Sequence, residues 1–118
     1  MSTLKLISLI VMAAFYGFTG FMHFKSPKFF LKITPKWVPA PEKVNLVVGA
    51  IEIALAIGVL IPQTRHWAAW GIIALLVAVF PANIYHFQKS LEKKRQVIPT
   101  LIRLPIQFLM IYWAYTFV

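Results

Sequence analysis

The sequence predicts an all-α membrane protein, a four-transmembrane-helix bundle with a short interfacial helix between the first and second spans. Hydrophobic residues make up 60% of the 118 residues, and the mean hydropathy of +0.77 is far above that of soluble globular proteins. A helix needs about 20 mostly apolar residues to cross the hydrocarbon core. Four stretches meet this requirement, residues 4–24, 44–61, 67–87 and 100–117, and we expect residues 1–118 to form a single transmembrane domain.

The first apolar stretch, residues 4–24, is predicted to be a retained transmembrane helix. It is longer than the roughly 7–15 apolar residues of a signal peptide, and no clear small-residue cleavage site precedes the polar sequence. After it, Ser26 can cap a helix and Pro27 suits the first helical position. Residues 26–33 therefore predict a short interfacial helix.

The connection between the first two spans is expected to lie on the membrane surface. An amphipathic helix at this level buries its apolar side at the headgroup boundary and turns its cations toward phosphates. The lysines predicted to contact lipid headgroups are Lys28, Lys32 and Lys36. Pro35, Pro39 and Pro41 then predict a non-helical return into the second span.

The second span, residues 44–61, carries two lines of small or polar residues on a helical wheel. One line is Ala50, Ala54 and Gly58; the other is Asn45, Gly49, Glu52 and Ala56. Small residues let helix backbones approach closely in a membrane. Both lines are therefore predicted to face neighbouring helices, with Glu52 facing protein.

The third and fourth spans each contain a proline. Pro81 leaves the carbonyl of Val77 without its helical donor, and Pro105 lies in the early turns of the fourth span. Asn83, Arg103 and Gln107 lie close to these prolines. The pattern predicts that exposed backbone and polar side chains meet at one membrane level.

The distribution of charge predicts the orientation. Nine positive charges lie in the first and third connections, whereas Lys5, near the N-terminus, and Arg65, between the second and third spans, lie on the other side. Positive loops face the cytoplasm, so both termini are predicted to lie outside a cell inner membrane. The net charge of +9 fits anionic lipid headgroups better than nucleic acid. The aromatic residues predicted to share the outer interface are Trp67, Trp70, Tyr112, Trp113 and Tyr115.

Glu52 is the residue that most suggests a site, because an ionisable group within a span is a functional candidate. It is one of three acidic residues in the chain, and it is predicted to pair with Arg103 at a similar depth. The predicted ligand-binding residues are Glu52, Arg103, Asn83, Gln107 and His23. An apolar pocket with a few converging polar groups suits the head of a quinone or lipid.

Other interpretations of the polar residues remain open. The same side chains can form a self-satisfied network that fixes helix register without a ligand. Haem ligation by His23 and His86 is disfavoured, because both lie near the interface. A transporter needs paired broken helices, and only Pro81 and Pro105 suggest them. No catalytic residue and no metal-ligand set is predicted, and the chain has no cysteine.

Several segments resemble the DoxX-like family of small four-span membrane proteins. They are residues 20–24 and 26–30, residues 37–42, residues 49–53 with Pro62, residues 80–85, and residues 103–107. The resemblance covers nearly the whole chain and implies a four-helix membrane fold with a link to quinone-dependent oxidoreductases. It also implies a role as a partner or assembly factor for larger membrane complexes. Family roles that depend on thiols do not apply, because this chain lacks cysteine.

The sequence thus favours a non-catalytic accessory subunit of a quinone-linked redox system, which binds a quinone or lipid near Glu52 and Arg103. The alternative is a scaffold or assembly factor without enzymatic activity. The expected partners are membrane lipids, together with a larger membrane complex or further copies of the chain.

Overall fold

The structure is a computed structural model that describes the backbone of residues 1–118 and every side chain except that of Ile33. It consists of five helices: α1 (Thr3–Lys25), α2 (Pro27–Ile33), α3 (Pro41–Leu60), α4 (Arg65–Lys93) and α5 (Val97–Tyr115). The helices α1, α3, α4 and α5 are long and apolar enough to cross a membrane. The predicted fold class, with a short helix between the first two spans, is confirmed.

Local sequence explains where the helices begin. The Ser2 hydroxyl accepts a hydrogen bond from the Lys5 amide at 3.1 Å and caps α1. Pro27 and Pro41 occupy early positions of α2 and α3, where a missing amide costs nothing. Ser26 lies at the cap position of α2, but its side chain makes no capping bond. Because Pro41 begins α3, the helix of the second span starts three residues before the predicted position.

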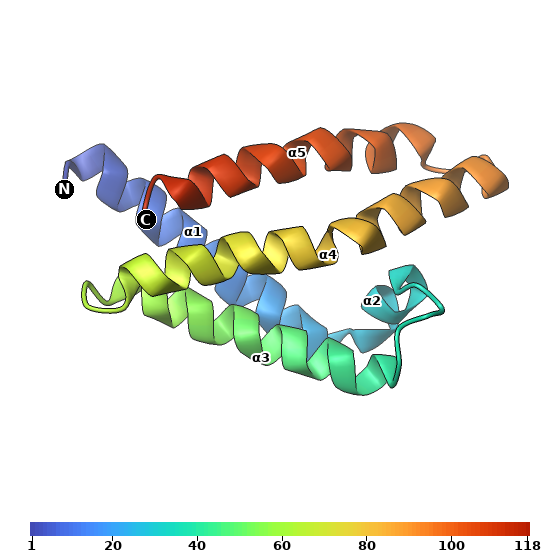
Figure 1. Cartoon of the computed structure of the whole chain (residues 1–118), viewed down its shortest axis with the longest axis horizontal. Coiled ribbons are helices and arrows are strands. Elements are labelled where there is room, and N and C mark those ends of the chain that lie inside the picture. Colours follow the sequence, from blue (N-terminus) through green and yellow to red (C-terminus); the bar gives the residue numbers. More distant parts are fainter.

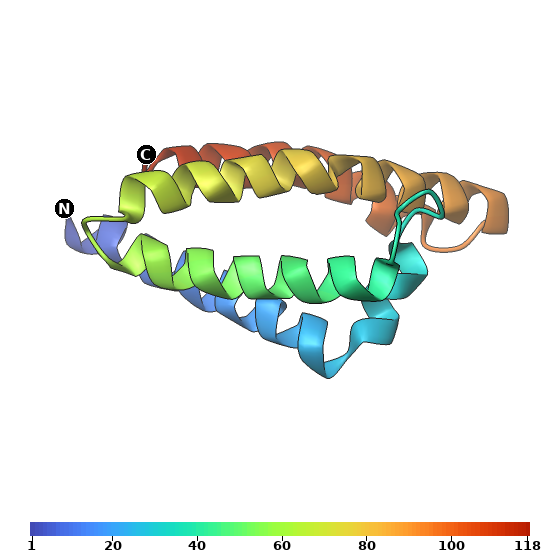
Figure 2. The same cartoon turned by 60° about the horizontal axis from the view of Figure 1, so that its bottom comes forward.

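The bundle is built from two helix pairs. α1 packs on α3, α4 packs on α5, and contacts between α3 and α4 join the pairs. Both termini lie at one end, which we call the termini end (Figures 1 and 2). The two basic connections and α2 lie at the opposite end, which we call the basic end (Figure 1). This separation matches the predicted grouping of basic loops, and their cytoplasmic placement remains a prediction.

The hydrophobic core lies in the half of the bundle next to the termini end. Its buried residues come from the early and middle turns of α1, the last turns of α3, the first half of α4 and the last residues of the chain. They are Leu9, Met12, Ala13, Tyr16, Ala56, Val59, Ala68, Ala69, Ile72, Leu76, Ala114 and Phe117. Toward the basic end, the buried residues are instead polar or small, among them His23, Asn45, Thr100 and Gln107. The two halves are thus held together by different interactions.

The seam between α1 and α5 is closed only near the termini. Trp113 Nε1 donates a hydrogen bond to Ser8 Oγ at 2.8 Å, and this bond ties α5 to α1. The Cα atoms of these two helices stay more than 8 Å apart along their whole length, so this side-chain bond is what joins them. Trp70 and Tyr115 also meet at this end, with ring centroids 6.2 Å apart, as the predicted aromatic grouping requires.

Two glycines set the contact between α1 and α3. A Cβ at Gly20 would lie 2.8 Å from the carbonyl oxygen of Gly49, and one at Gly49 would lie 2.9 Å from that of Gly20. The predicted line through Asn45, Gly49 and Glu52 therefore faces protein. The other predicted line is wrong in part. Gly58 contacts Ala68 of α4, but Ala50 and Ala54 are exposed because α1 covers the opposite face of α3.

Candidate functional site

The predicted polar residues form two clusters, one on each helix pair. Glu52 and His23 belong to the α1–α3 pair, whereas Asn83, Arg103 and Gln107 belong to the α4–α5 pair. The structure therefore does not place all five around one ligand. Each cluster has its own hydrogen bonds and its own environment.

In the α1–α3 cluster, Glu52 is bound by side chains of α1. The hydroxyl of Thr19 donates to Glu52 Oε2 at 2.8 Å, and His23 Nε2 lies 3.7 Å from the same oxygen. The side chain of Glu52 is 13% exposed. The predicted pairing of Glu52 with Arg103 is wrong, because the Gly20–Gly49 contact turns this face of α3 toward α1.

His23 is held on three sides. The amide nitrogen of Asn45 donates to the carbonyl oxygen of His23 at 2.8 Å, which leaves the amide oxygen facing Nδ1 of the ring at 2.6 Å. Nδ1 is therefore the donor in that bond. Phe30 of α2 stacks on the imidazole with ring centroids 3.7 Å apart. These contacts join α1, α2 and α3 at the level of His23.

In the α4–α5 cluster, two amides join the helices. The amide nitrogen of Asn83 donates to Gln107 Oε1, and the amide nitrogen of Gln107 donates to the carbonyl oxygen of Leu76. Arg103 Nη1 lies 3.2 Å from Nδ1 of His86. The carbonyl that accepts from α5 is therefore that of Leu76, one residue before the Val77 carbonyl that Pro81 deprives of its donor.

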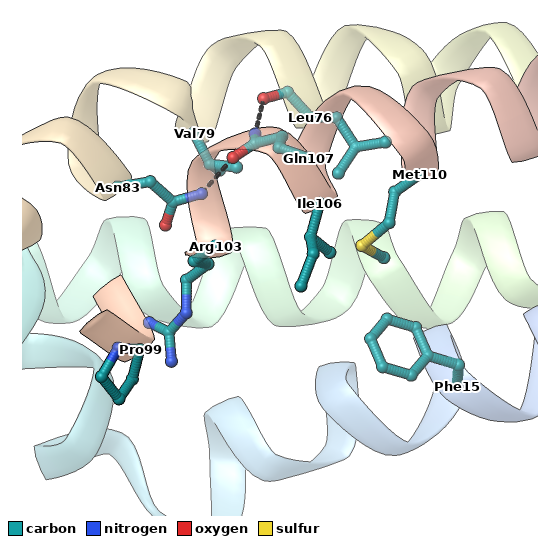
Figure 3. Close-up of a pocket in the computed structure, with 9 residues that line it drawn as sticks. All are labelled: Phe15, Leu76, Val79, Asn83, Pro99, Arg103, Ile106, Gln107 and Met110. Atoms are coloured by element: carbon teal, nitrogen blue, oxygen red, sulfur yellow. Dashed lines mark hydrogen bonds between the residues drawn. The ribbon is translucent and has the colours of Figure 1, made fainter. Parts of the chain in front are cut away.

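A cavity of about 360 Å³ lies beside this second cluster, between α1, α4 and α5. We call it the apolar cavity. Its polar lining consists of Asn83, Arg103 and Gln107, and its other walls are Phe15, Leu76, Val79, Pro99, Ile106 and Met110. Ile106 and Met110 project from α5 toward the side on which Phe15 of α1 lies (Figure 3). The polar groups and Pro99 occupy the side nearer the basic end, and Phe15, Leu76 and Met110 the side nearer the core.

The geometry of Arg103 leaves it able to bind a ligand. Among the described residues it makes one side-chain hydrogen bond, to His86. A guanidinium has five N–H donors and no acceptor. An oxygen-bearing head group that enters the apolar cavity would therefore meet donors on Arg103, whereas the amides of Asn83 and Gln107 are already bonded to the protein.

Two residues of the α1–α3 cluster were missed as site candidates, Thr19 and Asn45. Tyr16, Thr19 and His23 follow the i, i+3, i+7 spacing of one helical face, and this spacing was the available signal. The Tyr16 hydroxyl is buried, and it has no hydrogen-bond partner among the described residues. The predicted headgroup lysines Lys28, Lys32 and Lys36 are all exposed near the basic end.

Residues 12–118 match a family model described as a domain of unknown function, DUF8561. The chain belongs to this family. Comparison with curated proteins and with solved structures gives no match. The DUF8561 match and the four long apolar helices together describe a small multi-pass membrane protein. The likeness to DoxX-like proteins stays a prediction.

Proposed function

We propose that this DUF8561 protein binds one amphipathic molecule, a quinone or a lipid, in the apolar cavity. The observation that carries the proposal is the cavity itself, about 360 Å³ with polar groups gathered on one side of otherwise apolar walls. Ligand pockets of proteins are commonly about 300–1,000 Å³ and have this division of polar and apolar lining. The cavity is thus large enough for the head and first carbons of such a molecule.

Arg103 would bind the head group, and the apolar walls would contact the tail. Its guanidinium suits the carbonyl oxygen of a quinone or the ester or phosphate oxygen of a lipid. Glu52 and His23 are not part of this proposed site, because their side-chain contacts lie within the α1–α3 pair. Their role is to hold the wall of the bundle that carries Phe15.

The accessory role in a quinone-linked redox system rests on the resemblance to DoxX-like proteins and on the quinone class of ligand. It needs no catalytic group in this chain, because the partner would carry the electron transfer. Identification of a quinone in the purified protein would support this role. Identification of a phospholipid alone would support lipid binding without the redox link.

The test is to block the cavity and measure what the purified protein retains. Ile106→Trp adds a ring to a residue that lines the cavity, and Leu109→Trp adds the same ring to a neighbouring α5 residue that is 67% exposed and outside the lining. Bound molecules are released from protein purified in mild detergent and identified by mass spectrometry. We expect Ile106→Trp to lose the molecule and Leu109→Trp to keep it.

Equal retention by the two variants would refute the cavity as the binding site. An empty cavity in the wild-type protein, combined with a membrane protein that co-purifies in fixed ratio, would instead favour the scaffold or assembly role. The folding of both variants is checked by their unfolding temperature, so that loss of ligand is not confused with loss of structure.

A further inference from the structure

A second pocket, of about 560 Å³, adjoins the apolar cavity at the basic end. The two share Pro99 and Arg103 in their linings. The second pocket receives side chains from α2, from the last turns of α4, from the α4–α5 turn and from the start of α5. We call it the basic pocket, because five cationic residues line it: Lys32, Lys89, Lys93, Arg95 and Arg103.

Among the described side chains, no acidic residue lines the basic pocket, and the carboxylate nearest in sequence, that of Glu92, lies outside the lining. Among the described side chains, none of the five cations forms a salt bridge with a carboxylate. Lys89 lies over the ring of Tyr85, with its nitrogen 5.4 Å from the centroid, and Arg103 contacts His86. Five like charges around one pocket repel one another, and a bound anion would offset this repulsion.

The depth of the basic pocket places it at the level of lipid headgroups. α4 has 29 residues. At 1.5 Å per residue it is about 44 Å long, whereas the hydrocarbon core is about 30 Å thick. Since Trp67 and Trp70 mark its other interface, the last turns of α4 extend beyond the hydrocarbon. These last turns contribute Lys89 and Lys93 to the pocket.

We propose that the basic pocket binds the phosphate-bearing head of an anionic lipid whose tail enters the apolar cavity. This inference rests on the proposed function and names the class of ligand. Arg103 stands between the two spaces, so it would contact the phosphate or the ester group where head and tail join. A cluster of cations between transmembrane helices at the membrane surface is a known type of site for anionic headgroups. A soluble phosphate compound shares the headgroup chemistry but would leave the apolar cavity unused.

The test compares two phospholipids with the same chains, one with an anionic head and one with a zwitterionic head, and a soluble phosphate compound. Purified protein in neutral detergent is titrated with phosphatidylglycerol, with phosphatidylcholine of the same chains, and with glycerol phosphate, and binding is followed by native mass spectrometry. Lys89→Gln/Lys93→Gln removes two charges from the pocket. Lys25→Gln/Lys43→Gln removes two exposed charges near the same end from residues outside its lining.

We expect phosphatidylglycerol to bind more tightly than phosphatidylcholine, and glycerol phosphate to compete weakly. The pocket variant should weaken phosphatidylglycerol binding about 10- to 30-fold, since each cation near a membrane surface contributes about 1 kcal/mol. The control variant should bind as the wild type does. Arg95→Gln, an exposed change in the α4–α5 turn, repeats the test if the double variant does not fold.

Three results would overturn the inference. They are equal binding of the two lipids, equal weakening of phosphatidylglycerol binding by the pocket and control variants, and binding of glycerol phosphate as tight as that of phosphatidylglycerol. If Ile106→Trp displaces a bound neutral lipid or quinone and the lysine changes do not, the proposed function would stand without the further inference. If the lysine changes displace phosphatidylglycerol and Ile106→Trp does not, this result would refute the proposed function and leave only the anion site.

Discussion

Gly49 is expected to determine how closely α1 packs on α3. A Cβ at this position would lie 2.6 Å from the Cβ of His23 and 2.9 Å from the carbonyl oxygen of Gly20. Carbon atoms pack at about 3.5–4.0 Å, so even alanine requires a displacement of about 1 Å. Neither neighbouring atom is the end of a flexible side chain, and the helices themselves must therefore separate.

The expected loss follows from two opposing effects. Overpacking a close contact costs about 1–3 kcal/mol, and a clash with backbone belongs at the upper end of that range. Replacing glycine by alanine within a helix returns about 1 kcal/mol through helix propensity. Gly49→Ala should therefore lower the free energy of unfolding by about 1–2 kcal/mol. Gly49→Val should lower it further, because it adds bulk and gains less propensity.

The measurement is equilibrium unfolding in mixed micelles, with the denaturing detergent titrated and helix content followed by circular dichroism. Ala50→Leu is the matched control, because Ala50 is the next residue and is exposed. Ala50→Leu should change the free energy of unfolding by no more than about 0.5 kcal/mol. Gly20→Ala and Gly49→Ala together should cost less than the sum of the two, since one separation of the helices accommodates both Cβ atoms. Wild-type stability in Gly49→Ala, with Gly49→Val no worse than Ala50→Leu, would refute the reasoning.

Three further predictions concern the polar groups and the orientation. Glu52 and Thr19 should be coupled by about 0.6–1.7 kcal/mol in a double-mutant cycle of Glu52→Gln and Thr19→Val. The effects of Glu52→Gln and Arg103→Gln on the free energy of unfolding should instead be additive. The reverse pattern would restore the Glu52–Arg103 pair. Tyr16→Phe should leave stability unchanged or raise it by about 1 kcal/mol, because it removes a buried hydroxyl that has no partner among the described residues. A clear loss in the same unfolding assay would mean that the hydroxyl binds a ligand or water. A reporter that is active only in the periplasm should be active when fused after Val118, and its silence beside an active cytoplasmic reporter would reverse the predicted orientation.

The positions of the helices were predictable because membrane thickness imposes the length of an apolar stretch. The start of the short helix at Pro27 was predictable because proline suits the first position of a helix. The start of α3 was placed three residues late, since the proline at position 41 was taken as a helix breaker although it occupies the beginning of the helix. Local sequence thus predicts which helices form, with errors in their bounds where a residue such as proline can either end a helix or begin one.

The site was harder to predict because depth along a helix does not determine which neighbour a side chain meets. Glu52 and Arg103 were matched by depth alone. A helical wheel correctly placed Gly49 and Glu52 on one face of α3, but it could not say that α1 would cover that face. That choice depends on Gly20, whose backbone admits the close approach. Which helices pack together depends on the surfaces of both helices, and a helical wheel describes the surface of only one.

The different composition of the two halves of the bundle explains why a ligand site would form near the basic end. Toward the termini, apolar side chains from all four long helices fill the interior. Toward the basic end, α4 and α5 are joined through Gln107, and α1 and α3 through Asn45 and Glu52. These polar bonds lie within each pair, so they do not draw the pairs together across the α1–α5 seam. An amphipathic molecule in the apolar cavity would supply the contact that the side chains do not make there, with Arg103 holding its polar end.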